Sequence, residues 1–500
     1  MGSYLPYILS QLLQPFNFSL LLIGNIIGLI FGAIPGLSGT LAVILFMALT
    51  YTMKTAPSVI FLISLWVGGC SGAFIGSILL GIPGSPSAVA TCFDGYPMAQ
   101  KGKAGKALAI GMCASLIGTF FSAIFGALLS EKIADLAFKL GPWEYFSLCL
   151  LAITMVVAIS KGNMLKGLAS GFLGLLLACI GYSPIDAEPR FVFGNMYLMS
   201  GLSMIVVMIG IFGVSKILYE YAKGFSVLPE VDTKSIKGLG ITLHEIKAQF
   251  GNILRSFGIG LGIGFLPGMG AGLSNLVSYS ACKNASKHPE RFGTGVPEGL
   301  WASEVANNAS VGGSLIPMSA LGIPGDSTTA LLIGALTIHG LEMGPMVFKN
   351  SGNIVFLMFG AVAAGAIIVF ILQALGMRIF PEILKVPYHY MYPALLVVSF
   401  VSCYVESASL YKCGMLIVFA ILGVVMAFGD LPVAPLILAF ILEPTLESNM
   451  LKAFQYTGTG VTFFARPISC IFILLSIFSV FSPILRFLFN KFKKNKALSA

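Results

Sequence analysis

The chain has 500 residues, of which 57% are hydrophobic and only 10% are charged. A soluble globular domain is charged at about 25% of its positions, so this composition argues against a water-soluble protein. The net charge of +9 does not indicate nucleic-acid binding, because Lys and Arg are scattered in short loops and in a basic tail, as the positive-inside rule expects of a membrane protein.

Apolar windows almost without charge recur along the whole chain. Most are as long as the roughly 18 residues that mark a membrane-spanning helix. They cover residues 16–51, 107–129, 148–159, 354–375 and 467–488. Counting interrupted windows as well, we expect about 10 to 12 transmembrane and re-entrant helices. The predicted fold class is therefore an all-α polytopic membrane protein in contact with lipid.

Four Pro-Gly interruptions occur in two matched pairs. "GAIPGLSGT" (32–40) recurs as "GFLPGMGAG" (264–272), and "GIPGSPSA" (81–88) recurs as "GIPGDSTT" (322–329). The offsets are similar, 232 and 241 positions, and the order is the same. A duplicated unit explains this better than chance.

The duplication divides the chain into two membrane halves. We expect a first half over 1–222 with a core repeat at about 16–130, and a second half over 252–500 with a core repeat at about 252–350. The stretch 223–251 is polar and is read as a linker. The two repeats are expected to have inverted topology, as in many transporters.

A broken helix is costly inside a bilayer, because freed backbone groups find no water there. It is tolerated where it is buried in protein or lines a wet cavity. Matching Gly/Pro interruptions in two halves point to a transporter binding site. The alternative for any single Pro is a kink that packs against neighbouring helices.

The residues at and after each Pro-Gly are small or hydroxylated. A helix that restarts there presents free N–H groups and a positive dipole end, which suits a carboxylate ligand without any Lys or Arg. Alternatively, each hydroxyl bonds only within its own helix. The substrate-binding candidates at the breaks are Pro35, Gly36, Ser38, Gly39, Thr40, Pro83, Gly84, Ser85, Ser87, Pro267, Gly268, Gly270, Gly272, Ser274, Pro324, Gly325, Ser327, Thr328 and Thr329.

Four further polar residues lie near the second pair of breaks. Glu304, Asn307 and Asn308 lead into an apolar run, and their position at its mouth makes them functional candidates, with an N-cap role for Asn308 as the alternative. Asp326 directly follows a Pro-Gly, where a carboxylate caps a helix but repels an anion. Asp326 and Glu304 are the candidates for coupling to a proton or sodium ion, with Asn307 and Asn308 added to the substrate-binding set.

These motifs resemble the large membrane subunit of tripartite tricarboxylate transporters, the TctA family. The resemblance covers residues 16–485 and rests on "GAIPGLSGT", on 79–111 and above all on 267–336. It implies secondary active import of a di- or tricarboxylate such as citrate across the bacterial inner membrane, driven by sodium or protons. It also implies a small four-span membrane subunit of the TctB type and a periplasmic substrate-binding protein of the TctC type. No cofactor is expected besides the coupling ion.

The sequence departs from the family pattern at three places. The element usually written "APESANNA" reads "ASEVANNA" here (302–309), Asp326 stands where a small residue is usual, and Ser38 and Thr40 add hydroxyls after the first Pro-Gly. These positions are where selectivity is expected to be set. They weaken the assignment of citrate itself as the substrate.

Other classes of function fit the sequence less well. An intramembrane enzyme needs a clustered nucleophile and base or a metal, and the four histidines are dispersed while the nine cysteines form no CxxC pair. We expect neither catalysis nor a metal site. A passive anion channel with the same broken-helix site, or an exporter, is the alternative.

Overall fold

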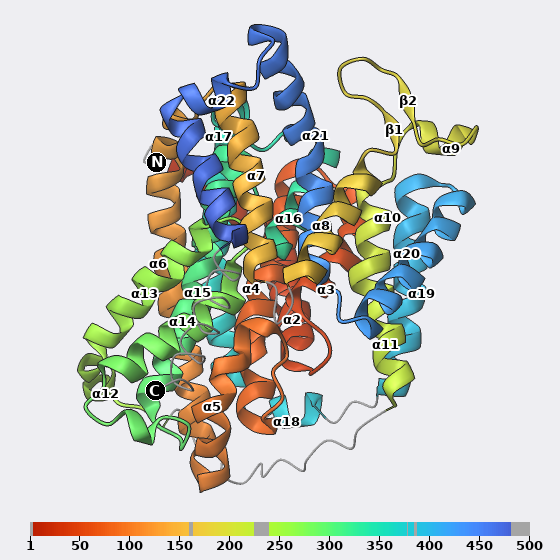
Figure 1. Cartoon of the computed structure of the whole chain (residues 1–500). Helices are drawn as coiled ribbons and strands as arrows, with labels where there is room; N and C mark the ends of the chain where they lie inside the picture. The colour runs from red at the N-terminus through yellow and green to blue at the C-terminus, as the bar shows by residue number, and fades with distance from the viewer. Residues whose placement is uncertain (1–3, 160–163, 225–239, 378, 385–387, 482–500) are drawn as a thin grey trace, which may run out of the picture.

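The computed structural model describes residues 4–159, 164–224, 240–377, 379–384 and 388–481. These residues form a helical assembly (Figure 1). Within them, extended structure is limited to a two-stranded antiparallel hairpin of β1 (Gly181–Tyr182) and β2 (Pro189–Arg190). The all-α fold class is confirmed.

Four of the described α-helices contain an interior Pro. They are α1 (Leu5–Leu12), α2 (Pro15–Ala33), α3 (Gly39–Phe46), α4 (Thr55–Leu80), α5 (Val89–Met98), α6 (Ala104–Ala137), α7 (Pro142–Ile159), α8 (Met164–Ala178), α9 (Met196–Met199), α10 (Met204–Met208), α11 (Ser215–Lys223), α12 (Leu243–Ala248), α13 (Phe250–Phe265), α14 (Gly270–Ala285), α15 (Pro297–Leu321), α16 (Ser327–Ile338), α17 (Pro345–Gly376), α18 (Phe380–Ile383), α19 (Tyr388–Ser407), α20 (Leu410–Phe428), α21 (Val433–Thr457) and α22 (Thr462–Ala465).

The helix lengths and compositions are those of a multi-pass membrane protein. Among the described residues, 6 helical segments are long and apolar enough to cross a membrane. They are Pro15–Ala33, Thr55–Leu80, Pro86–Ala137, Met204–Lys223, Pro345–Gly376 and Leu410–Phe428. Shorter apolar helices accompany them, so the interrupted segments expected from the sequence are present beside the full-length spans.

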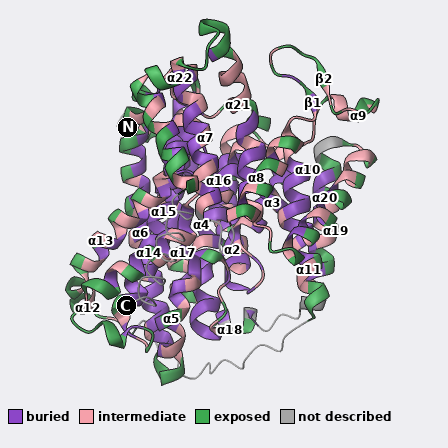
Figure 2. Cartoon of the chain, viewed as in Figure 1, coloured by how far each residue is buried: buried purple, intermediate pink, exposed green. Residues whose placement is uncertain are grey.

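Burial separates central from peripheral helices (Figure 2). The most apolar window of α4 is 94% buried, whereas that of α20 is 28% buried. The side chains that α20 exposes are apolar, among them Ile421, Val425 and Phe428. In a membrane protein such a surface faces lipid, so α20 lies at the periphery and α4 at the centre.

Two helix pairs pack through glycines at matching positions. A Cβ on Gly32 of α2 would meet the Gly69 carbonyl oxygen of α4 at 2.2 Å, and a Cβ on Gly264 of α13 would meet the Ser310 carbonyl oxygen of α15 at 2.6 Å. Gly32 and Gly264 are 232 positions apart, and Gly69 and Ser310 are 241 positions apart, which are the same two offsets as those of the Pro-Gly motifs. Both pairs therefore have the close, small-residue contact typical of membrane helices.

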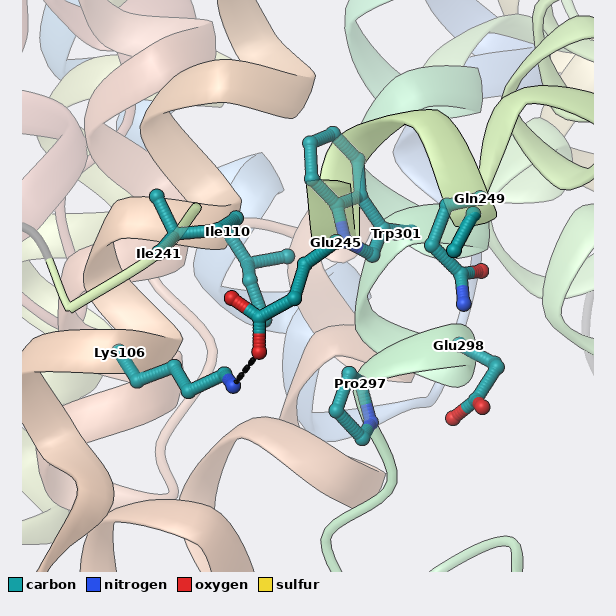
Figure 3. A pocket seen from close by; sticks show the side chains of 9 residues that line it. Lys106, Ile110, Ile241, Glu245, Gln249, Pro297, Glu298 and Trp301 are labelled. Atoms are coloured by element: carbon teal, nitrogen blue, oxygen red, sulfur yellow. Dashed lines mark hydrogen bonds and ion pairs between the residues drawn. The ribbon is translucent and has the colours of Figure 1, made fainter. Parts of the chain in front are cut away.

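The polar segment between the two predicted halves is described from residue 240 onward, and residues 225–239 lie outside the described residues. Its helix α12 starts with a capping box at Thr242. Glu245 of α12 pairs with Lys106 of α6 beside a cavity of about 190 Å³ whose wall includes Trp301 (Figure 3). The segment is thus tied back to the start of α6, while the domain boundaries at 222 and 252 stay predictions.

Candidate functional site

The four Pro-Gly interruptions converge on one cavity of about 270 Å³. Residues that follow each interruption contribute to its wall, together with α4 and α21. The lining residues are Ser38, Gly39, Thr40, Trp66, Gly69, Cys70, Ser85, Pro86, Ser87, Gly268, Met269, Gly270, Ala271, Gly272, Asp326, Ser327, Thr328 and Ala434. Segments separated by more than 200 positions in the sequence thus build a single polar site.

Left-handed glycines produce the interruptions. α4 and α15 end at Gly81 and Gly322, whose φ angles are 68° and 71°. The other two breaks turn at Gly36 and Gly268, with φ of 86° and 73°. L-residues with a Cβ avoid this region, so the chain reverses where glycine permits it and the adjacent Pro keeps the helix from continuing.

The helices that restart at the cavity are capped in different ways. Ser38 caps α3, its Oγ accepting a hydrogen bond from the Leu41 N–H at 3.2 Å. Asp326 caps α16 in a capping box, its Oδ1 accepting from the Thr329 N–H at 2.8 Å. α14 begins at Gly270 with no side-chain cap. The N-terminus of α16 is therefore already neutralised by a carboxylate, and those of α3 and α14 are not.

Hydroxyl groups link the wall of the cavity across the interruptions. The Oγ1 atoms of Thr40 and Thr328 lie 2.7 Å apart and join the first turns of α3 and α16. The Oγ atoms of Ser85 and Ser87 lie 2.6 Å apart beside the start of α5. In both pairs either oxygen can donate, so the pair can turn a hydrogen toward a ligand oxygen.

The described wall of the cavity carries one acidic side chain and no basic one. Asp326 is the one charged side chain among its described lining residues. An anion held here would be bound by backbone N–H groups, hydroxyls and helix dipoles, and its negative charge would need a cation to accompany it.

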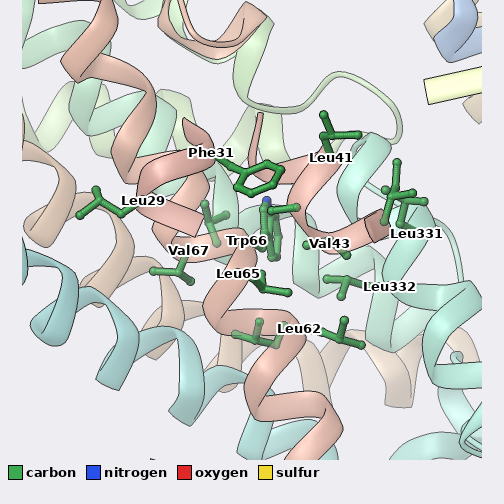
Figure 4. Packing of buried hydrophobic residues seen from close by; sticks show 14 of the residues in the cluster. Leu29, Phe31, Leu41, Val43, Leu62, Leu65, Trp66, Val67, Leu331 and Leu332 are labelled. Atoms are coloured by element: carbon green, nitrogen blue, oxygen red, sulfur yellow. The ribbon is translucent and has the colours of Figure 1, made fainter. Parts of the chain in front are cut away.

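A layer of packed apolar side chains lies beside the cavity, and Figure 4 shows part of it. Trp66 of α4 is 2% exposed and belongs to a core cluster with Leu41 of α3 and with Leu331 and Leu332 of α16. Side chains from both predicted halves thus share one core directly beside the polar wall. This packing holds the restarting helices α3 and α16 against one another in this conformation.

The predicted site residues fall into two groups. Those that line the cavity are Ser38, Gly39, Thr40, Ser85, Ser87, Gly268, Gly270, Gly272, Asp326, Ser327 and Thr328. Those outside its described lining are Pro35, Gly36, Pro83, Gly84, Pro267, Ser274, Glu304, Asn307, Asn308, Pro324, Gly325 and Thr329. The Pro and Gly residues of the second group shape the turns. The Ser274 hydroxyl donates to the carbonyl oxygens of Ala271 and Ala306 and is not part of the cavity lining.

The position expected for Glu304, Asn307 and Asn308 is wrong. They lie in the middle of α15, which begins at Pro297, and all three are fully buried. The helix already includes the polar residues before these three, so the three do not stand at the start of the apolar run. For the same reason Asn308 is not an N-cap. The capping role expected for Asp326 is confirmed.

Several lining residues carried no signal in the sequence. Trp66, Gly69 and Cys70 lie within the long helix α4, and Ala434 lies in α21. Pro86, Met269 and Ala271 are next to residues that were predicted, so a broader window around each break would have included them. From the sequence, a residue in the interior of a long apolar helix, such as Trp66, is predicted only to belong to the hydrophobic core.

A multi-pass helical membrane protein with a polar cavity built at helix interruptions belongs to the class of membrane transporters. The chain belongs to the tripartite tricarboxylate transporter TctA family, whose model matches residues 18–438. The family resemblance seen in the sequence is confirmed. The chain is thus a membrane component of a transporter that works with other subunits.

Two relatives come from Agrobacterium vitis. An uncharacterized 52.8 kDa protein in the TAR-I ttuC' 3' region is 32% identical over 458 residues, which cover 91% of this chain and 91% of the relative. An uncharacterized protein in the TAR-II ttuC' 3' region is 32% identical over 224 residues, which cover 45% of this chain and 93% of the relative. No solved structure matches the chain.

Proposed function

We propose that the chain imports a di- or tricarboxylate across the bacterial inner membrane and that a cation gradient, of sodium or protons, drives this import. The observation that carries the proposal is the cavity in which all four Pro-Gly interruptions meet. Its wall offers hydroxyls and helix N-termini and, among its described residues, no basic side chain. Such a site suits carboxylate groups that arrive together with a cation.

The substrate carboxylates are assigned to the uncapped and Ser-capped helix starts. α14 presents its first N–H groups at Gly270, and α3 presents those that follow Ser38. The α16 end is less suitable for an anion, because Asp326 already occupies it. A substrate with two or more carboxylates therefore bridges α3, α14 and the Ser85–Ser87 segment.

Alternating access follows from the duplicated arrangement. With inverted repeats, an exchange of conformation between the two units exposes the cavity first to one side and then to the other. Labelling of Lys101–Lys106 and Lys283–Arg291 from each side tests this topology. The inverted arrangement is rejected if both segments react from the same side and their cores have the same orientation.

The partners proposed are those of the family: a small four-span membrane subunit and a periplasmic binding protein that delivers the substrate. The apolar helices α19 and α20 offer exposed faces for lipid or for another membrane subunit. Copurification of the three proteins from the native membrane tests this composition.

The first experiment is thermal stabilisation of the purified chain by acetate, succinate, malate, tartrate, citrate and tricarballylate, each with sodium or with potassium. We expect di- or tricarboxylates, but not acetate, to raise the melting temperature, with a larger rise when the coupling ion is present. Uptake into vesicles then separates a carrier from a channel, because only a coupled carrier accumulates substrate against its gradient. The absence of stabilisation by every compound, also with both partner subunits added, would contradict the proposed substrate class.

A further inference from the structure

A buried carboxylate without a cationic partner lies behind the wall of the cavity. Glu304 of α15 has 0% of its surface exposed, and no described Lys, Arg or His forms an ion pair with it. Its Oε1 accepts a hydrogen bond from the Thr91 hydroxyl of α5. An unpaired charge in such a place costs several kcal/mol, so the group must gain a counter-charge or a proton.

The other neighbours of the Glu304 carboxylate are neutral amides. Its Oε2 accepts from the Nδ2 atoms of Asn308 at 3.3 Å and Asn307 at 3.4 Å. The Oδ1 of Asn307 is itself buried and accepts no hydrogen bond from the described residues. A metal ion would need converging oxygens, whereas here nitrogen and hydroxyl donors surround the carboxylate. The unused Oδ1 is an acceptor available to a protonated carboxyl group after rotation of the Asn307 amide.

The residues that hydrogen-bond Glu304 and Asn308 are close in sequence to lining residues of the cavity on two sides. Thr91 lies one helical turn beyond Ser87, which lines the cavity. On the other side the Oδ1 of Asn308 accepts a hydrogen bond from Ser71, which directly follows the lining residue Cys70. The carboxylate and its partner Asn308 are thus held by residues four and one positions away from lining residues of the segment before α5 and of α4.

The charged groups on the surrounding helices are engaged elsewhere. Asp94 of α5 accepts from the Tyr279 hydroxyl of α14 and from loop N–H groups. Lys106 of α6 pairs with Glu245. Arg255 of α13 donates to Asn252. Asp326, which precedes α16, accepts from the Thr329 N–H, and α17 carries its one Lys, Lys349, over the Phe138 ring. Cys70 of α4 and Cys92 of α5 are further titratable groups on these helices.

We propose that Glu304 carries the coupling proton of the transport cycle, as a site distinct from the carboxylate-binding cavity. The proposal rests on the proposed function. In the cycle hydronium transfers a proton to a Glu304 oxygen as substrate enters, so that one O–H bond of hydronium breaks and the carboxyl O–H bond forms. After substrate release the carboxyl group gives a proton to water on the opposite side, which restores the carboxylate and forms hydronium there. The Thr91 hydroxyl and the two Asn amides satisfy the carboxyl group in both states.

The test is Glu304→Gln, which has the shape of the protonated acid and cannot release a proton. The complete transporter with its partner subunits is reconstituted in vesicles, and labelled citrate and succinate are the probes. We expect the variant to lose uphill accumulation under a proton gradient and to keep exchange of internal for external substrate. The matched control is Glu298→Gln, an exposed residue in the first turn of the same helix, which should behave like the wild type.

A second measurement does not depend on transport. Infrared spectra of the wild-type chain are recorded as a function of pH, and a C=O band of a protonated carboxyl group should be present that is missing in Glu304→Gln. The proposal is overturned if the band is the same in both proteins, or if Glu304→Gln accumulates substrate as the wild type does. It is also overturned if the only change in Glu304→Gln is that uptake no longer depends on sodium, while uptake driven by a proton gradient stays as in the wild type. Failure of the wild type to transport either probe, with the band present, would count against the substrate class and not against the protonation of Glu304.

Discussion

Thr40 and Thr328 lie 288 positions apart in the sequence, and their hydroxyl oxygens lie 2.7 Å apart in the wall of the cavity. Each belongs to the first turn of a helix that restarts after a Pro-Gly interruption. The contact joins α3 to α16 at the point where a ligand would bind. A movement of one unit against the other would change this contact and the shape of the site together.

Thr40→Val and Thr328→Val each remove the hydroxyl bridge while keeping the side-chain shape. We expect each to lower stability by about 1 kcal/mol, the usual size of an interhelical hydrogen bond in a membrane, and to weaken carboxylate binding. Thermal unfolding with and without citrate measures both effects. In the double variant the second substitution should add little, because the partner has already gone. Full additivity would show that the two hydroxyls act separately.

Gly84→Leu and Gly325→Leu are expected to abolish transport while the protein still inserts into the membrane. A Cβ at Gly84 would lie 2.3 Å from the Gly32 carbonyl oxygen, and one at Gly325 would lie 2.6 Å from the Gly264 carbonyl oxygen. Backbone atoms cannot move aside easily, so we expect a loss of about 1–3 kcal/mol in stability as well. Gly262→Ala is the control, since a Cβ there meets nothing within 4 Å. Normal uptake by either Leu variant would remove that break from the mechanism.

Asp326→Asn should strengthen the binding of a dicarboxylate to the cavity by about fivefold, because it removes roughly 1 kcal/mol of repulsion from the one charged lining side chain. Asn is also a good N-cap, so the fold should be retained, whereas Asp326→Ala should cost about 1 kcal/mol of stability. Calorimetric titration with succinate measures the affinity. Weaker binding in Asp326→Asn would mean instead that this carboxylate holds a cation beside the substrate.

The ion pair between Lys106 and Glu245 predicts an acid-sensitive attachment of α12 to α6. The hydrogen bond from Lys106 lowers the pKa of Glu245 below its ordinary value. The pair therefore stabilises the fold at pH values above the ordinary carboxyl pKa, and this contribution is lost as the pH falls through the lowered value. Glu245→Gln should lower the melting temperature at neutral pH and flatten its decrease in acid. Lys103→Gln, at an exposed neighbouring position, is the control and should leave the pH profile unchanged.

The sequence alone determined the features that depend on short stretches of chain. An apolar window long enough to span a bilayer must be helical, and a Pro-Gly pair interrupts such a helix. Both expectations follow from the properties of the backbone in lipid. The matched offsets predicted a duplicated unit, and the motifs predicted the family. The cap at Asp326 was equally local, since it needs only the N–H of Thr329 three residues later.

The tertiary structure decided which residues share the site. Trp66 and Ala434 line the cavity although their helices carry no signal for it. Glu304 and Asn308 are buried in the middle of α15, although they were expected where the apolar run begins. The physical reason is that the packing of helices that are far apart in the sequence determines which side chains line the cavity. Close glycine contacts such as Gly264 against Ser310 set that packing, and no single stretch of sequence contains both partners.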